Sequence, residues 1–127
     1  MSFEVFFYKN RTSSDVITLY QADDSGLTLN SGDKVRFKVY RRDQAIPALD
    51  IDSIEALSGG SLVTVNQIAS AAQVTLKVCQ ADIASLPPGA YEAEISVVDS
   101  GDSNLVKVAE VGSVNILQSG GGDVGAT

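Results

Sequence analysis

The sequence has 127 residues, a formal net charge of −7 and no histidine. A chain of this length forms one domain and can bury a hydrophobic core, which its 44% apolar content can fill. The acidic balance argues against nucleic acid and anionic membrane as partners, because both attract positively charged surfaces. Without histidine the commonest general base and the nucleophile–histidine pairs are missing, so we expect no enzyme.

Cysteine content and the N-terminal segment bear on where the protein is made. A single cysteine, Cys79, cannot form an internal disulfide, and we interpret it as a small apolar residue. The opening residues, MSFEVFFYKNR, lack the basic and long apolar regions of a secretion signal. No stretch approaches the roughly 20 consecutive apolar residues of a membrane span. We therefore expect synthesis in the cytoplasm without a signal peptide.

Apolar residues alternate with polar ones along most of the chain, which is the pattern of strands with one buried face. The expected strands, in chain order, are 3–8, 16–20, 34–40, 49–52, 62–65, 74–78, 91–98, 106–108 and 114–116. Turns rich in glycine and aspartate separate them at 22–26, 30–33, 58–60 and 99–102. One helical turn is expected at 80–86, where two prolines and a glycine follow.

This spacing of short strands and turns predicts an all-β fold. We expect an immunoglobulin-like antiparallel β-sandwich of seven to nine strands with one short helical turn. The sandwich is expected to span residues 1–118. The remaining residues, 119–127, read SGGGDVGAT and are expected to form a flexible glycine-rich tail.

The most specific local signal is the segment from Leu86 to Tyr91. Pro87 and Pro88 fix the backbone and end the preceding element, and Gly89 permits a left-handed turn. A tyrosine then opens an alternating strand, which is the sequence form of a tyrosine corner. In such a corner Tyr91 fills the edge of the core and returns its hydroxyl to nearby backbone. An ordinary core tyrosine is the alternative.

Three stretches resemble the immunoglobulin-like domains of tailed-phage virion proteins, such as the N-terminal domain of siphophage baseplate upper proteins. They are ITLYQADDSGLTLNSGDKVRFKVYRR, VTLKVCQADIASLPPGAYEAEISVVD and GSVNIL, within residues 14–117. In such domains an Asp/Gly turn precedes the central strand, a Leu-x-Pro-Gly-x-Tyr corner leads into the penultimate strand, and a glycine introduces the last. The chain departs from antibody-type domains, because it has no tryptophan and one cysteine, and from full baseplate proteins, which have further domains.

The resemblance implies a non-catalytic structural or assembly component of a phage or prophage particle, in the tail, baseplate or neck region. The implied location is the virion, and the implied partners are other virion proteins or further copies of the chain in a homo-oligomer. A carbohydrate- or receptor-binding β-sandwich module is the alternative. That function would need exposed aromatic side chains, and outside the first strand only Tyr20 and Tyr40 are expected to point outward.

Carboxylates are the chemistry that the chain has in supply. Glu92 and Glu94 share one strand face, and paired carboxylates carry out glycoside hydrolysis. Five of the nine basic residues fall within 34–42, however, so we expect a ladder of ion pairs across neighbouring strands. Arg36 and Lys38 are the expected partners of the two glutamates. We therefore expect no catalytic residues in this chain.

Aspartates at expected turns and strand ends raise the question of a metal site. Asp50 and Asp52 could meet Asp99 and Asp102 at an edge of the sandwich and hold Ca²⁺. Aspartates without a complete ligand loop usually form turns. We therefore expect no metal and no cofactor.

The first strand is apolar on both faces, although a sandwich strand needs only one buried face. Phe3, Val5 and Phe7 lie on one face, and Phe6 and Tyr8 on the other. Exposed aromatics on an edge strand promote aggregation unless something covers them. Either the glycine-rich C-terminal segment or a long loop covers Phe6 and Tyr8, or the two residues form a contact with another copy or another virion protein.

Overall fold

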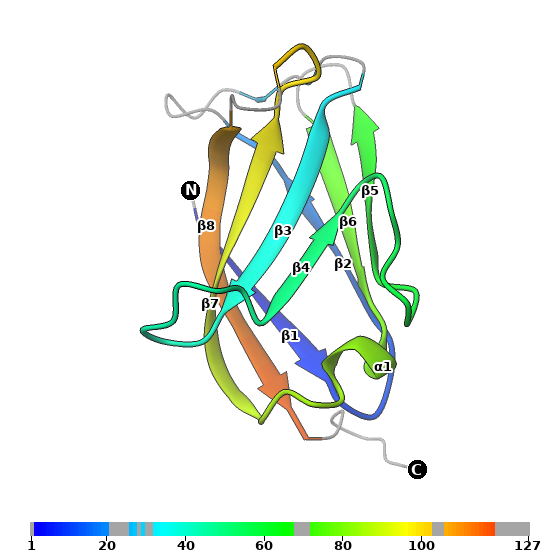
Figure 1. The fold of residues 1–127 in the computed structure, drawn as a ribbon, viewed down its shortest axis with the longest axis vertical. Helices are drawn as coiled ribbons and strands as arrows, with labels where there is room; N and C mark the ends of the chain where they lie inside the picture. Colours follow the sequence, from blue (N-terminus) through cyan, green and yellow to red (C-terminus); the bar gives the residue numbers. More distant parts are fainter. Residues whose placement is uncertain are drawn as a thin grey trace.

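Strands make up nearly all of the regular structure. The computed structural model describes residues 2–20, 26–27, 29, 32–67, 72–102 and 106–118. Within these ranges the elements are β1 (Ser2–Tyr8), β2 (Ser13–Thr18), β3 (Lys34–Tyr40), β4 (Leu49–Asp52), β5 (Leu62–Gln67), β6 (Ala72–Val78), α1 (Gln80–Ile83), β7 (Gly89–Val98) and β8 (Val106–Leu117) (Figure 1). The prediction of an all-β sandwich with one short helix is confirmed.

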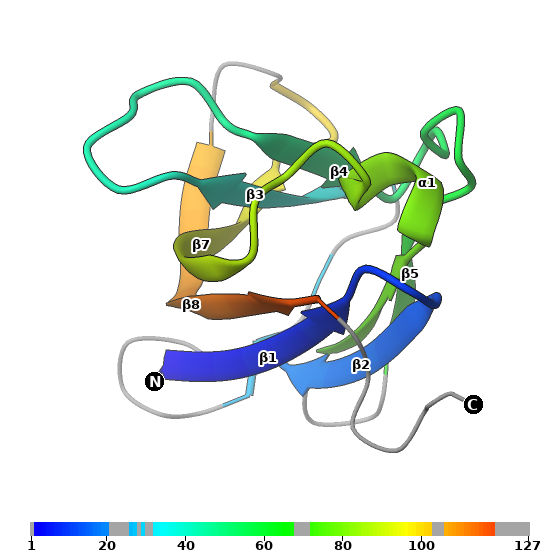
Figure 2. The same cartoon turned by 90° about the horizontal axis from the view of Figure 1, so that it is seen from below.

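The strands form two sheets in the orders β1-β8-β7-β3-β4 and β2-β6-β5. All paired strands run antiparallel except β1 and β8, which run parallel from Ser2 opposite Val111 to Tyr8 opposite Leu117. Figure 2 shows the larger sheet curving so that its edge strand β1 lies alongside β2, the edge strand of the smaller sheet. Two unpaired strand edges therefore meet along one side of the sandwich.

The core lies between the sheets because each strand turns its alternate apolar residues inward. In β3, for example, Val35, Phe37 and Val39 are fully buried, while the residues between them are half-buried. The Phe37 ring centroid lies 6.1 Å from that of Phe7 and 6.2 Å from that of Phe3. Burial of each such ring stabilises the fold by about 2–3 kcal/mol. The first strand is thus attached to the centre of the core.

Two expected elements differ in extent. The helix ends at Ile83, and Leu86 continues as a turn in which its N–H donates to the Ile83 carbonyl oxygen at 3.0 Å. The strands expected at 106–108 and 114–116 are one continuous strand, β8. It remains continuous because β7 pairs with it from Val106 to Ile116, and a bulge between Ile95 and Ser96 absorbs the irregularity.

Gly112 lies in the middle of β8, so it does not introduce the last strand as the resemblance implied. A Cβ atom added there would lie 2.2 Å from the carbonyl oxygen of Phe3 and 2.7 Å from the Phe3 ring. Because no side chain fits that gap, glycine is what allows β1 to pair with β8.

Some expected features fall outside the described residues, namely the glycine-rich tail at 119–127 and most of the turn at 22–26. In the part of the chain that is described, no helix has the length and hydropathy needed to cross a membrane.

Candidate functional site

The outer face of β1 carries exposed aromatic side chains, as its sequence predicts. Glu4, Phe6 and Tyr8 point outward while Val5 and Phe7 are buried, and Phe6 is 44% exposed. Tyr8 is half-buried because the guanidinium carbon of Arg11 lies 4.2 Å from the centre of its ring. We call Phe6, Tyr8 and Arg11 the β1 surface.

Two shallow hollows follow the seam between β1 and β2. One, of about 330 Å³, is lined by the β1 surface and by residues 12–15. The other, of about 270 Å³, lies between Glu4 and Val16 and shares Asp15 with the first. Burial in this seam raises the pKa of Asp15. The carboxylate of Glu110, which is only 4% exposed, also lines the second hollow and accepts a hydrogen bond from the Tyr20 N–H at 3.2 Å.

The predicted corner has the geometry of a tyrosine corner. Tyr91 is buried at the start of β7, and its hydroxyl donates to the carbonyl oxygen of Pro87 at 2.5 Å, four residues upstream. Gly89 has a φ of 148°, which a residue with a side chain rarely adopts. Leu86 is buried in the core beside the corner. The corner has a structural character, since it consists of a hydrogen bond from the Tyr91 hydroxyl to the backbone and of two side chains packed in the core.

A second polar anchor lies on α1, and no sequence pattern predicted it. Asp82, on α1, accepts hydrogen bonds at 3.0 Å from the N–H groups of Gly59 and Ser61, and from the Ser61 hydroxyl at 2.5 Å. The Ser61 hydroxyl in turn accepts from the N–H of Cys79 at 2.8 Å. Both Ser61 and Cys79 are buried. The network ties the loop before β5 to the helix that follows β6.

Burial alone would raise the pKa of Asp82. The hydrogen bonds from Ser61 and Gly59 outweigh burial, and they hold the pKa of Asp82 below its ordinary value of 3.8. No local sequence pattern could have revealed this network, because Ser61 and Gly59 lie 21 and 23 residues before Asp82 in the chain.

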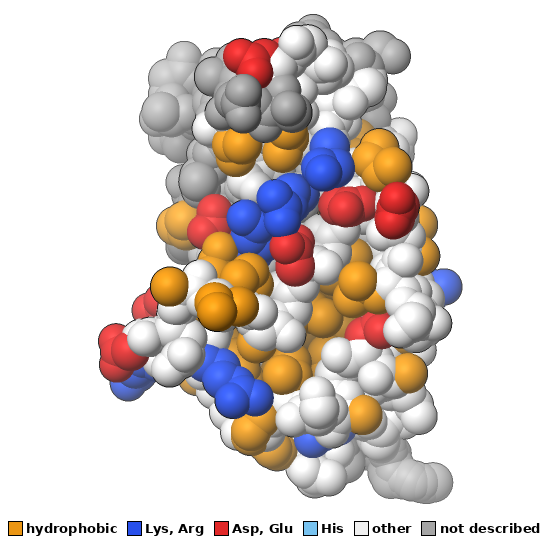
Figure 3. Space-filling model, in the orientation of Figure 1, with side chains coloured by type: hydrophobic (Ala, Val, Ile, Leu, Met, Phe, Trp, Pro, Cys, Tyr) orange, Lys and Arg blue, Asp and Glu red, His pale blue; other side chains and the backbone are white. Residues whose placement is uncertain are grey.

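The charged outer face of the larger sheet is arranged differently from the expected ladder. β3 does lie beside β7, and Lys38 stands opposite Glu94. However, Arg36 stands opposite Ser96 on that side, and its guanidinium forms an ion pair with Asp50 of β4 at 2.5 Å. Figure 3 shows the basic side chains crossing this face as a diagonal band, with acidic side chains on both sides. The expected pairing of Arg36 with a glutamate of β7 is therefore wrong, because β4 places the Asp50 carboxylate against the Arg36 guanidinium.

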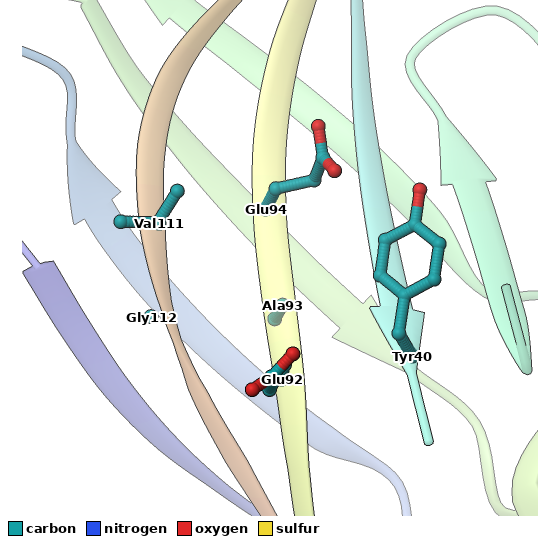
Figure 4. A pocket seen from close by; sticks show the side chains of 6 residues that line it. All are labelled: Tyr40, Glu92, Ala93, Glu94, Val111 and Gly112. Carbon is teal, nitrogen blue, oxygen red and sulfur yellow. The ribbon is translucent and has the colours of Figure 1, made fainter. Parts of the chain in front are cut away.

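The two glutamates instead border a hollow. Tyr40, Glu92 and Glu94 project from the outer face of β3 and β7, and Val111 projects from β8 beyond them (Figure 4). Together with Ala93 and Gly112 they line a shallow hollow of about 370 Å³, which we call the carboxylate hollow. Burial first, and then the charge and hydrogen bonding of Glu94, raise the pKa of Tyr40. Glu92 and Glu94 are the two acidic residues that line the hollow.

Three of the four aspartates considered for calcium, namely Asp50, Asp52 and Asp99, bind backbone N–H groups or an arginine instead. Asp50 pairs with Arg36, and Asp52 accepts from the N–H groups of Ile54 and Glu55 at 2.8 Å each. Asp99 accepts from the Gly101 N–H at 2.9 Å. In the described ranges no three acidic, histidine or cysteine side chains gather in a way that could hold a metal ion.

The comparisons with known proteins identify no family. No protein-family model matches the sequence, and a search of the curated proteins finds no significant match.

Proposed function

We propose that the sandwich is of the immunoglobulin-like type. If β2 to β8 are taken as strands B, C, C′, D, E, F and G, the sheets have the orders G-F-C-C′ and B-E-D, which are those of an immunoglobulin variable-type domain without its outermost strands. The tyrosine corner at the start of β7 supports this assignment, because such corners precede strand F. β1 takes the place of strand A in the chain and pairs with the last strand.

We propose that the chain is a non-catalytic structural or assembly component of a phage or prophage particle, which associates with further copies of itself. The proposal that the chain belongs to such a particle is supported by the resemblance of three of its stretches to virion immunoglobulin-like domains. The observation that carries the assembly role is the β1 surface. Phe6 is 44% exposed on an edge strand, next to a hollow of about 330 Å³. The centres of protein interfaces are enriched in aromatic side chains and arginine, which are the residue types of the β1 surface.

Light scattering on purified protein tests this role. Replacing Phe6 and Tyr8 by serine should lower the mass in solution while leaving the far-UV circular dichroism unchanged, because both side chains point away from the core. A matched control replaces Ile54 and Val106, two exposed apolar residues elsewhere, by serine. Equal effects of the two double variants, or no effect of the first, would contradict association through β1.

A carbohydrate-binding module is the second candidate, and the carboxylate hollow favours it. An aromatic ring beside carboxylates suits a sugar, which stacks on the ring and donates its hydroxyls to the acids. A glycan array with the wild type and with Tyr40→Ala would support this function if binding to one sugar class disappears in the variant.

A further inference from the structure

The carboxylate hollow is lined by two acidic side chains, and no ion pair between described residues involves either of them. Among the described residues the ion pair on this face joins Arg36 to Asp50, and Glu92 has no ion-pair partner. Lys38 stands opposite Glu94 in the register, but its ammonium group does not come within ion-pair distance of that carboxylate. A positively charged group that entered the hollow would therefore meet two carboxylates and the ring of Tyr40.

Two matching cations directly follow Tyr40, a residue that lines the hollow. Arg41 and Arg42 follow Tyr40 directly, at the start of the loop between β3 and β4. Both are exposed, and neither forms an ion pair within the described part of the chain. Figure 2 shows this loop projecting away from the sheet. Guanidinium groups stack on aromatic rings and form two-pronged hydrogen bonds with carboxylates, so arginine suits this hollow better than a neutral sugar does.

We propose that two copies of the chain pair through this face, with the loop of each copy entering the carboxylate hollow of the other. Because the loop begins directly after Tyr40, which lines the hollow, one two-fold axis can bring each loop onto the opposite hollow at the same time. Such a contact also covers apolar surface, since Ile46 in the loop is 79% exposed and Val111 at the hollow is 55% exposed. This surface is distinct from the β1 surface, so the proposal does not depend on the proposed function.

A charge-exchange experiment tests the pairing. Arg41→Glu with Arg42→Glu places an acidic loop beside an acidic hollow, and Glu92→Arg with Glu94→Arg places a basic hollow beside a basic loop. Each variant alone should associate at least about tenfold more weakly than the wild type, because like charges then face each other. Mixed in equal amounts, the two variants should form a heterodimer, since every loop then meets a hollow of opposite charge. Sedimentation equilibrium with one variant labelled measures both results.

Two controls keep the result clear. Lys9→Glu with Lys77→Glu changes the net charge as much as the loop variant does but lies elsewhere, so it should not weaken pairing beyond the effect of net charge. If the double hollow variant does not fold, Glu92→Arg alone replaces it, since Glu92 is exposed. A wild type that is monomeric at every attainable concentration, or a mixture that does not combine, overturns the proposal. Sugar binding that depends on Glu92 also overturns it.

Discussion

At the scale of single residues, two polar side chains anchor the end of the sandwich that carries α1. Tyr91 reaches back four residues to the Pro87 carbonyl, and Asp82 reaches across to Gly59 and Ser61. The first contact could be predicted because all of its parts lie within one short segment. The second could not, because an aspartate in a helical turn is typical of any helix start and its partners lie in another loop. Both contacts give a partner to backbone groups in part-buried surroundings.

Removal of the corner hydroxyl should weaken the fold. Tyr91→Phe keeps the ring but leaves the Pro87 carbonyl oxygen without its donor, so we expect the free energy of unfolding to fall by about 1 kcal/mol. A urea titration measures the change. Tyr20→Phe is the matched control, because no hydrogen bond from its hydroxyl is found among the described residues and its stability should stay within about 0.5 kcal/mol of wild type. Equal losses in both variants would show that the corner bond contributes nothing specific.

Asp82 should make stability depend on pH in the acid range. The pKa of Asp82 in the folded state lies below the ordinary value of 3.8, so its contribution is complete above that value and is lost as the pH falls through the folded pKa. Asp82→Asn should lower the free energy of unfolding by about 1.5–3 kcal/mol at pH 7. The difference from wild type should shrink steadily below about pH 4.

Urea titrations at a series of pH values measure this difference. Asp43→Asn is the control, because Asp43 is exposed at a φ of 64°, which asparagine also tolerates. A deficit of Asp82→Asn that stays constant down to pH 2 would show that the carboxylate charge is not what matters.

At the scale of elements, the period-two pattern identified the strands but not their partners. β3 and β4 have the predicted bounds, since both are short segments with strict alternation. Alternation assigns each residue to a face but does not say which strand lies beside which. For that reason the parallel pairing of β1 with β8, and the ion pair between Arg36 and Asp50 on β4, became visible only in the structure. The outward position of Phe6 and Tyr8 was predictable because it depends on the face alone.

The β1–β8 pairing should depend on Gly112. Gly112→Ala puts a methyl group 2.2 Å from the Phe3 carbonyl oxygen, so β1 must move, at a cost of about 1–3 kcal/mol in the free energy of unfolding. Amide hydrogen exchange should accelerate first in β1, while β5 and β6 keep their protection. Gly101→Ala is the control, since its added methyl meets only a flexible carboxylate oxygen, at 3.3 Å. Uniform acceleration across both sheets would show that the glycine acts on the whole fold and not on this pairing.

At the scale of the whole molecule, the net charge of −7 is distributed unevenly. Five of the nine basic residues lie on β3 and in the loop that follows it, although the chain as a whole is acidic. Two copies repel each other at long range, and a contact between them offsets this repulsion either by bringing opposite charges together or by burying apolar area. The loop and the carboxylate hollow offer the first, and the β1 surface offers the second. The chain thus presents two different kinds of surface at two different places.

The two surfaces should act independently. Phe6→Ser with Tyr8→Ser removes the aromatic contact and should leave pairs held by the loop and the hollow, while Arg41→Glu with Arg42→Glu should leave only association through β1. The protein that carries all four substitutions should be a monomer, because neither contact then remains. Sedimentation velocity over a range of concentrations distinguishes the three species. If either double variant alone is already a monomer at every concentration, the surface that it retains does not associate by itself, and the assignment of independent roles is wrong.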